Sequence, residues 1–413
     1  MLQAIVHASE LLTGTGIRLK DGRKVTDDDL GRIEDGALVY STRKVRGKEV
    51  PDEILWVGPT PDMPRKYSRI KKRDLKGKQA VIPGMVDCHT HLVFAGDRSE
   101  EFAARCGGAS YEEIAKKGGG ILSTVRATRN ASERELETLA IKRLQEAVSY
   151  GVRTIEIKTG YGLSAESELK LLKVIRKLKE RCPEVRIQST FLGAHAFPQD
   201  QSRESYLDDL INRMIPQAAT GKLADVCDVF IDAGYYTREE GRRILAAAKA
   251  NGLKIKIHAD ELANTESASL AAEMGALSAD HLLRISDSGI RALAASQTVA
   301  VLLPGTAFYL KASHAPARRL LDAGAAVALS TDFNPGTCMC LSLPSIMTIA
   351  ALYLGMTRAE IFAAVTYNGA KALGFEMDSG TLEPGLAARF AVLDFPRFEE
   401  LYYRFAWAPS RGR

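Results

Sequence analysis

The pattern of hydrophobic and polar positions divides the 413-residue chain into two kinds of sequence. Residues 1–75 hold short apolar runs, such as Ala37–Tyr40 and Glu53–Gly58, separated by glycine, proline and charged residues. Short runs bounded by turn-forming residues are typical of β-strands and predict a small β-rich unit. From Ala80 onward, strand-like runs alternate with amphipathic stretches, which favours successive βα units around a parallel sheet.

Eight strand-like runs follow one another in the second part. They are Ala80–Asp87, Thr154–Lys158, Arg186–Leu192, Val226–Ile231, Lys254–His258, Leu277–Asp280, Thr298–Leu303 and Ala326–Ser330. Helical patterns lie between them, for example at Ser164–Arg181, Thr237–Ala250, Asn264–Glu273 and Ala315–Ala323. Eight strands alternating with helices predict an α/β fold, a TIM-like (β/α)8 barrel, which usually needs about 250 residues. The alternative is an open doubly wound sheet, but its dinucleotide-binding fingerprint is missing, and Gly118–Gly120 does not supply it.

The last segment returns to short β-like pieces. Residues Gly380–Gly385 suit a turn and Arg389–Asp394 suits a strand, so we expect this segment to pair with the N-terminal unit. The predicted organisation is therefore a barrel over residues 76–376 and a small discontinuous β-sandwich built from residues 1–75 and 377–413.

Composition changes this picture little. The formal net charge is +5, and some of the excess lies between Ser41 and Lys78, which holds twelve Lys and Arg against five acidic residues. No nucleic-acid motif accompanies that stretch, so a solvated surface is favoured over a binding patch. The six cysteines form no CxxC pair, and no segment resembles a signal peptide or a membrane span. A reducing cytoplasm and no membrane partner are expected.

Candidate chemistry is concentrated where the predicted strands end. The first strand closes on His89 and His91, and residues two apart in a strand project from the same face, so both imidazoles could bind one ion. In a parallel barrel, functional side chains lie at this end of the strands, where the βα loops begin. Other strand ends carry His195, His258, Glu261, His281 and Asp332. For His195 and His281 the alternative is a structural role in the core.

Three imidazoles and one carboxylate, from His89, His91, His258 and Asp332, make a predicted site for one divalent or trivalent metal ion. Nitrogen and oxygen ligands suit zinc, with iron as the alternative. A cation there would lower the pKa of a bound water to roughly 7, and Asp332 could accept its proton. The fourth strand end, at Asp232, has no lysine that could form a bridging carbamate, which favours a single ion.

These residues resemble the amidohydrolase superfamily, in which strand one carries HxH, strands five and six carry His, and strand eight carries Asp. Longer stretches resemble the imidazolonepropionase family within it, over nearly the full chain. They are Asp87–Arg98, Gly118–Thr124, Thr159–Leu163, Thr190–Pro198, Ile257–Glu261, Ser278–Leu282 and Thr331–Thr337. Two stretches depart from the pattern, because Phe230–Gly234 replaces a usual Cys-Glu pair and Gly385–Arg389 replaces a common Lys-Ala-Asp turn.

The resemblance implies hydrolytic opening of 4-imidazolone-5-propanoate to N-formimidoyl-L-glutamate, a step of histidine degradation, by a homodimer that does not bind nucleic acid. It implies that Arg98 binds the substrate carboxylate and that Glu261 holds a ring N–H. His281 would stabilise the developing oxyanion, and Asp332 would pass a proton to the departing nitrogen. Further substrate contacts are expected from Tyr161, His195, Asn334, Gly336 and Thr337, with Tyr111 as an additional candidate.

Two other functions stay open at the level of sequence. The first is a deaminase of heterocyclic amidines, which would use the same single-metal site but release ammonia. The second is a non-catalytic barrel that serves as an assembly or binding module. Such a module would be expected to have lost metal ligands, whereas all four candidate ligands are present here.

Overall fold

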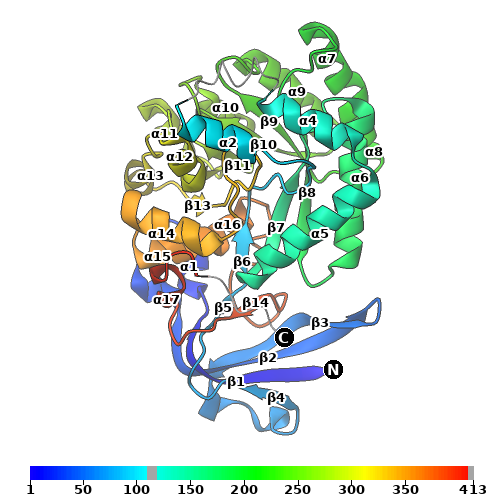
Figure 1. Ribbon diagram of the computed structural model, residues 1–413. Helices are drawn as coiled ribbons and strands as arrows, with labels where there is room; N and C mark the ends of the chain where they lie inside the picture. Colours follow the sequence, from blue (N-terminus) through cyan, green and yellow to red (C-terminus); the bar gives the residue numbers. More distant parts are fainter. Residues whose placement is uncertain (109–118, 408–413) are drawn as a thin grey trace.

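The computed structural model describes residues 1–108 and 119–407, which form a barrel with a smaller sheet beside it (Figure 1). Eight parallel strands are hydrogen-bonded to one another in the order of the sequence. They are β6 (Met85–Asp87), β7 (Val152–Lys158), β8 (Arg186–Ala194), β9 (Val226–Ile231), β10 (Lys254–Ala259), β11 (Ser278–His281), β12 (Val299–Leu302) and β13 (Val327–Leu329). This arrangement confirms the predicted TIM-like barrel over the open sheet.

The barrel closes just beyond the ends of its first and last strands. The amide of Asp332 donates to the His89 carbonyl at 3.1 Å, and the amide of His91 donates to the Phe333 carbonyl at 2.9 Å. Two segments that carry candidate metal ligands therefore also complete the barrel wall.

The carboxylate of Asp87 strengthens this junction from the end of β6. It accepts hydrogen bonds from the Ser330 hydroxyl and from the amide and hydroxyl of Thr331, the latter two at 3.0 and 2.8 Å. Burial raises the pKa of Asp87 to about 6, although these hydrogen bonds act in the opposite direction. Asp87 thus has a structural role in joining strand one to strand eight.

Helices surround the barrel wall (Figure 1). Those of the first half are α2 (Ser99–Cys106), α4 (Ile121–Asn130), α5 (Glu133–Ser149), α6 (Ala165–Arg181), α7 (Arg203–Asp209), α8 (Ile215–Thr220) and α9 (Arg238–Ala250). Those of the second half are α10 (Ser267–Met274), α11 (Asp287–Ala294), α12 (Pro304–Leu310), α13 (Ala317–Ala323), α14 (Leu343–Tyr353), α15 (Arg358–Val365) and α16 (Tyr367–Lys371). The predicted helix after Ser164 is present as α6, because the Ser164 hydroxyl caps its first turn by accepting from the amide of Ser167.

The predicted first strand, Ala80–Asp87, is in fact two strands. Residues Val81–Pro83 form β5 in the small sheet, and Met85–Asp87 form β6 in the barrel. The chain changes sheets at Gly84, whose amide donates to the Arg389 carbonyl at 2.8 Å and whose added Cβ would lie 2.5 Å from the Cβ of Arg153. The apolar pattern continues across the break because both pieces are buried, so it does not reveal the change of sheet.

The small sheet combines both ends of the chain, as predicted. Its order is β14 (Phe390–Val392), β5, β1 (Leu2–Leu12), β2 (Arg32–Val45) and β3 (Lys48–Pro59), with β4 (Lys71–Asp74) paired to β1. Strand β14 runs antiparallel to β5, with Ala391 opposite Ile82. Two further short helices are α1 (Thr15–Leu19) and α17 (Glu400–Tyr403), and η1 (Asp27–Leu30), η2 (Thr60–Asp62), η3 (Arg65–Tyr67) and η4 (Leu210–Met214) are short 3-10 or π segments. The exact domain boundaries stay a prediction.

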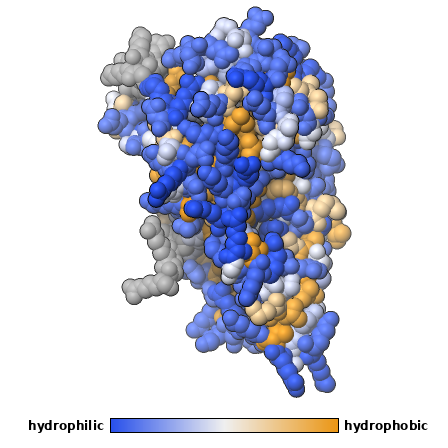
Figure 2. Space-filling model, turned by 90° about the vertical axis from the view of Figure 1, so that its right-hand side faces the viewer, coloured by the Kyte–Doolittle hydropathy of each residue, from blue (hydrophilic) through white to orange (hydrophobic). Residues whose placement is uncertain are grey.

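Polar residues cover most of one face of the molecule (Figure 2). The face shown in Figure 2 is predominantly hydrophilic, and its hydrophobic residues form separate smaller patches. The basic strand Lys71–Asp74 is exposed along its whole length, which agrees with the predicted solvated surface. Among the residues the structure describes, no helix combines the length and hydrophobicity needed to cross a membrane.

Candidate active site

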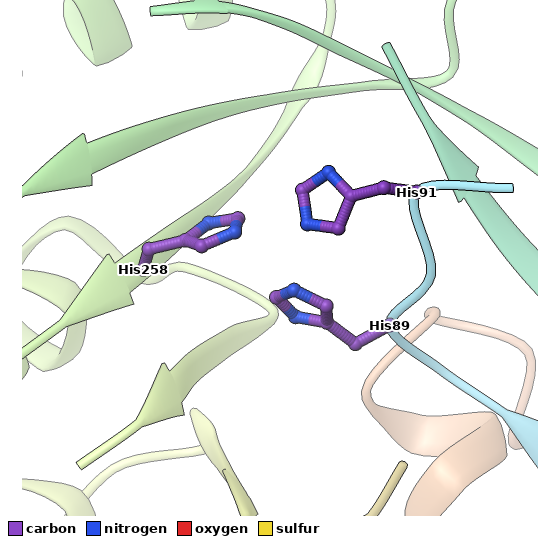
Figure 3. Close-up of side chains that lie close together, drawn as sticks. All are labelled: His89, His91 and His258. Atoms are coloured by element: carbon purple, nitrogen blue, oxygen red, sulfur yellow. The ribbon is translucent and has the colours of Figure 1, made fainter. Parts of the chain in front are cut away.

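Three histidines from two distant segments meet at the carboxyl end of the barrel strands. His89 and His91 follow β6, His258 lies on β10, and their rings surround a common space (Figure 3). One ring nitrogen from each lies within 4.8 Å of the others. The Nε2 atoms of His89 and His258 are buried and have no hydrogen-bond partner within the described residues. Because buried polar atoms are rarely left without a partner, this arrangement fits a bound metal ion.

Asp332 lies beside two of these histidines and forms a second possible metal-binding group with His89 and His281. Its Oδ1 lies 3.4 Å from His89 Nε2 and 3.6 Å from His91 Nε2, while its Oδ2 accepts from the Thr306 hydroxyl at 2.5 Å. Asp332 has a left-handed backbone conformation with φ of 50°, which is costly for a residue other than glycine and is often found at functional sites. Burial raises the pKa of Asp332 to about 7, and a neighbouring cation would act in the opposite direction.

The far sides of two imidazoles face carboxylates. His89 Nδ1 lies 2.6 Å from Asp280 Oδ2, and His258 Nδ1 lies 3.0 Å from Asp228 Oδ2. At His89 the carboxylate accepts from Nδ1 and leaves Nε2 able to bind a metal, whereas the His258–Asp228 contact has an ion-pair distance without hydrogen-bond geometry. Burial, together with the charge of Lys158, lowers the pKa of His89 well below its usual value, so the imidazole is neutral near pH 7.

A cavity of about 590 Å³ lies against this group. It brings together most of the predicted site residues: His91, Arg98, Tyr161, His195, His258, Glu261, His281, Asp332, Asn334 and Thr337. Gly336 lies beside the cavity, because a Cβ added to Gly336 would be 2.1 Å from Nη1 of Arg98. Tyr111 lies outside the described residues. The roles of all these residues stay predictions, but the proximity that those roles require is present.

Arg98 lies in the cavity wall as one half of an ion pair that the sequence did not suggest. Its Nε donates to Glu101 Oε2 at 2.9 Å, and its Nη2 donates to Glu101 Oε1. Burial opposes ionisation of Glu101, but the bonds from Arg98 and from the amide of Gly120 lower its pKa. Glu101 thus fixes two nitrogens of the guanidinium. The third, Nη1, lies against Gly336, on the loop that carries Asp332. The i, i+3 spacing of Arg98 and Glu101 was the available sequence signal.

The Asn334 side chain organises its own loop. Its Oδ1 accepts from the amides of Gly336 and Thr337 at 2.9 and 2.8 Å, and its Nδ2 donates to the Asp332 carbonyl at 2.7 Å. The amide of Gly336 is therefore already engaged within the loop. For Asn334 and Gly336, the structure supports a role in shaping the loop beside Arg98 more directly than a contact with substrate.

His195 also lines the cavity. Its ring stacks on that of His91 with centroids 4.9 Å apart, and its Nδ1 lies 3.1 Å from the Gly160 carbonyl. Burial, with a smaller effect from His258, lowers the pKa of His195 to about 3. A neutral imidazole that donates from Nδ1 to Gly160 presents Nε2 as a hydrogen-bond acceptor.

Glu261 and His281 line the cavity next to each other. Glu261 Oε2 lies 3.6 Å from His281 Nε2. Burial, followed by the charges of Asp332 and Asp232, raises the pKa of Glu261 well above its usual value. Burial lowers the pKa of His281 well below its usual value, so this imidazole is neutral. The pair can therefore offer both donors and acceptors to a polar ring.

Asp232 holds the loop that carries Glu261, and no pattern in the sequence predicts this role. Its Oδ2 accepts from the amides of Glu261 and Leu262, both at 2.8 Å, and its Oδ1 accepts from the amide of Ala263 at 3.0 Å. Asp232, which lies where this sequence differs from the family pattern after the fourth strand, thus anchors the loop after the fifth strand.

Sequence comparisons connect this site with known proteins. A profile of the amidohydrolase family matches residues 80–407. An imidazolonepropionase of Porphyromonas gingivalis (strain ATCC BAA-308 / W83) is 44% identical over 404 residues, which cover 97% of this chain and 93% of that protein. An imidazolonepropionase of Symbiobacterium thermophilum is 46% identical over 419 residues, covering 99% and 96% of the two chains. The chain belongs to the imidazolonepropionase family of amidohydrolases.

Other amidohydrolase-like structures share the fold at much lower identity. A 5-methylcytosine deaminase from Klebsiella pneumoniae aligns with a TM-score of 0.69 at 16% identity, covering 97% of this chain and 94% of that one. A zinc-containing adenosine deaminase from Xanthomonas campestris aligns with a TM-score of 0.63 at 17% identity, covering 95% and 84%. At these identities the likeness shows the fold alone and carries no argument about the activity of this chain.

Proposed function

We propose that this protein hydrolyses the ring of 4-imidazolone-5-propanoate to give N-formimidoyl-L-glutamate. The observation that carries the proposal is one cavity that joins the buried histidine and Asp332 group to the guanidinium of Arg98. That combination suits a small substrate with a hydrolysable ring at one end and a carboxylate at the other. The likeness to imidazolonepropionases over nearly the full chain supports the same substrate.

For the metal centre we propose His89, His91, His258 and Asp332 as the residues that hold one divalent ion, with zinc preferred and iron as the alternative. When bound, such an ion polarises a carbonyl group and makes a water molecule a better nucleophile at neutral pH. The unpartnered Nε2 atoms of His89 and His258 support this assignment.

Arg98 would bind the substrate carboxylate. Glu101 engages Nε and one N–H of Nη2, so both N–H groups of Nη1 and the second N–H of Nη2 remain for a ligand. Thr337 and Tyr161 line the same cavity and can add hydroxyl contacts. Because Glu101 fixes the guanidinium before substrate arrives, less side-chain freedom is lost on binding.

Glu261, His281 and Asp332 would carry out the proton transfers and charge stabilisation around the ring. Asp332 would take the proton from the attacking water and deliver it to the departing nitrogen. Neutral His281 donates a hydrogen bond to the oxygen on which negative charge develops. Glu261 orients the ring through an N–H group.

The decisive experiment measures substrate turnover by zinc-loaded protein. We expect the imidazolone absorbance to disappear without release of ammonia, and Asp332→Ala to lose at least about a thousand-fold in kcat because one group both binds the metal and transfers the proton. Near-normal turnover by Asp332→Ala would remove this residue from the mechanism. Ammonia release from a nucleobase, with no reaction of the imidazolone, would instead favour the deaminase alternative.

Two further properties belong to the same proposal. A homodimer in the cytoplasm is expected from the family resemblance and from the cysteines, all six of which are free. Sedimentation at several protein concentrations tests the dimer, and a monomer throughout that range would contradict it.

A further inference from the structure

Five charged side chains lie inside the barrel, beneath the three histidines. They are Glu156 and Lys158 on β7, Asp228 on β9, Lys256 on β10 and Asp280 on β11, and every one has zero exposure. We call this group the buried charge cluster. The interior of a TIM-like barrel is usually filled by branched apolar side chains. Its replacement here by charges is therefore a feature that packing alone does not explain.

The two lysines connect the carboxylates of the cluster. Lys158 Nζ lies 2.6 Å from Asp228 Oδ2, 3.0 Å from Glu156 Oε2 and 3.7 Å from Asp280 Oδ2. Lys256 Nζ lies 2.7 Å from Glu156 Oε2 and 3.4 Å from Asp280 Oδ2. Asp228 and Asp280 are thus held in place by ammonium groups that have no contact with solvent.

The oxygens held by the lysines are the same ones that face the metal-site imidazoles. Asp280 Oδ2 lies 2.6 Å from His89 Nδ1, and Asp228 Oδ2 lies 3.0 Å from His258 Nδ1. Each chain of contacts therefore runs from a lysine through a carboxylate to a histidine. A small displacement of Asp280 would rotate His89, because Asp280 Oδ2 is the hydrogen-bond partner of that ring on the side away from the metal. Asp228 acts on His258 through a close charge contact.

We propose that Lys158 and Lys256 are positioning residues of the metal centre, which hold Asp280 and Asp228 where these carboxylates orient His89 and His258. The inference rests on the proposed metal site and extends it by a further layer of residues. Stability gives a poor alternative explanation, because well-packed apolar side chains often replace buried ion pairs without loss. Orientation of the ligands gives a reason for the burial of these charges at this place.

The test compares cation affinity in the full-length protein and in the variants Lys158→Met and Lys256→Met. Zn²⁺ affinity is measured by competition with a chromophoric chelator, and the Co²⁺-loaded proteins are compared by their visible absorption spectra. If the lysines position the ligands, each variant binds Zn²⁺ about 10- to 100-fold more weakly and has an altered Co²⁺ spectrum. If they act only through their charge, removing a positive group near a cation site strengthens binding. Stronger or unchanged binding with an unchanged spectrum would overturn the proposal.

Two matched variants separate positioning from general damage to the fold. Lys371 is also a buried lysine, but it contacts Asp21 and Gln297 away from the site, so Lys371→Met should keep wild-type Zn²⁺ affinity. The double variant Lys256→Met/Glu156→Gln removes one charge of each sign and remains informative if a single variant does not fold. Weak Zn²⁺ binding by the double variant supports positioning, whereas wild-type affinity contradicts it.

Measurements on the wild-type protein separate the proposed function from the proposed role of the two lysines. A wild-type protein that binds no Zn²⁺ and hydrolyses no imidazolone would refute the proposed function itself. A wild-type protein that binds Zn²⁺ tightly, with lysine variants that bind it equally well, would refute only the role of the buried charge cluster.

Discussion

Single residues at this site act through their neighbours as much as through the cavity. Asp232 is an example, since its carboxylate accepts from the amides of Ala233, Glu261, Leu262 and Ala263 and touches no predicted metal ligand. One side chain thus sets the path of the loop that presents Glu261. The order of residues alone does not reveal this role, because Asp232 and Glu261 belong to different strands.

Replacing Asp232 with Asn should destabilise the protein and slow turnover. Asn has one acceptor oxygen, so its amide group would face two of the backbone donors, and each unsatisfied donor costs about 1–3 kcal/mol. We expect the free energy of unfolding, measured with urea, to fall by about 2 kcal/mol, and kcat to fall about tenfold. Asp322→Asn is the control, because Asp322 is 66% exposed. Equal effects of the two substitutions would contradict the loop-anchoring role.

At the scale of elements, helix ends follow local sequence closely. Helix α9 begins at a capping box in which the Thr237 hydroxyl caps the amide of Glu240 and the Glu240 carboxylate returns to the Thr237 amide. Arg203 adds contacts of 2.7 and 2.6 Å to the same carboxylate. Capping depends on residues three apart, so the sequence could place this helix start. The change of sheet at Gly84 depends on distant residues and was not predicted.

The Glu240→Gln substitution isolates the charge in this cap, because Gln can still complete a capping box. Hydrogen bonds from Arg203 are the main cause that lowers the folded-state pKa of Glu240 to about 2, below its usual 4.5. The charge therefore stabilises the fold above about pH 4.5, and this stabilisation is lost as the pH falls toward 2. We expect Glu240→Gln to lower the free energy of unfolding, measured with urea, by about 1 kcal/mol at pH 7 and by less at pH 3. A constant loss at both pH values, or an equal loss in Glu239→Gln, would refute the assignment.

At the scale of the whole molecule, the predicted metal ligands come from parts of the chain that are far apart. His89 follows the first barrel strand, His258 lies on the fifth and Asp332 follows the eighth. A bound ion would therefore join the beginning, middle and end of the barrel. Anything that binds only the folded state stabilises it in proportion to the logarithm of its concentration over its dissociation constant.

Removal of the metal should accordingly lower the thermal stability of the protein. With free Zn²⁺ at a thousand times its dissociation constant, the expected stabilisation is about 4 kcal/mol. Calorimetry of zinc-loaded and chelator-treated protein checks this value. The difference should persist in His7→Ala, since His7 pairs with Asp35 in the small sheet, and should disappear in His258→Ala. A chelator effect of equal size in His258→Ala would place the ion elsewhere.

The sequence by itself determined the succession of strands and helices, the pairing of the two chain ends and the set of polar strand ends. These features depend on local periodicity, on turn-forming residues and on the rule that parallel strands present their carboxyl ends together. His89, His91, His258 and Asp332 could be selected in this way; the three imidazoles lie close together, and Asp332 lies beside His89 and His91.

Only the tertiary structure decided which groups support those residues. No local pattern in the sequence is enough to mark these supporting residues. They are Thr306 beside Asp332, Glu101 beside Arg98 and Asp280 behind His89. The buried lysines give the clearest case, because charges alternating with isoleucine in a strand are equally suited to a solvated edge. Their burial depends on which face of the strand the barrel turns inward, and that choice is made by the packing of all eight strands together.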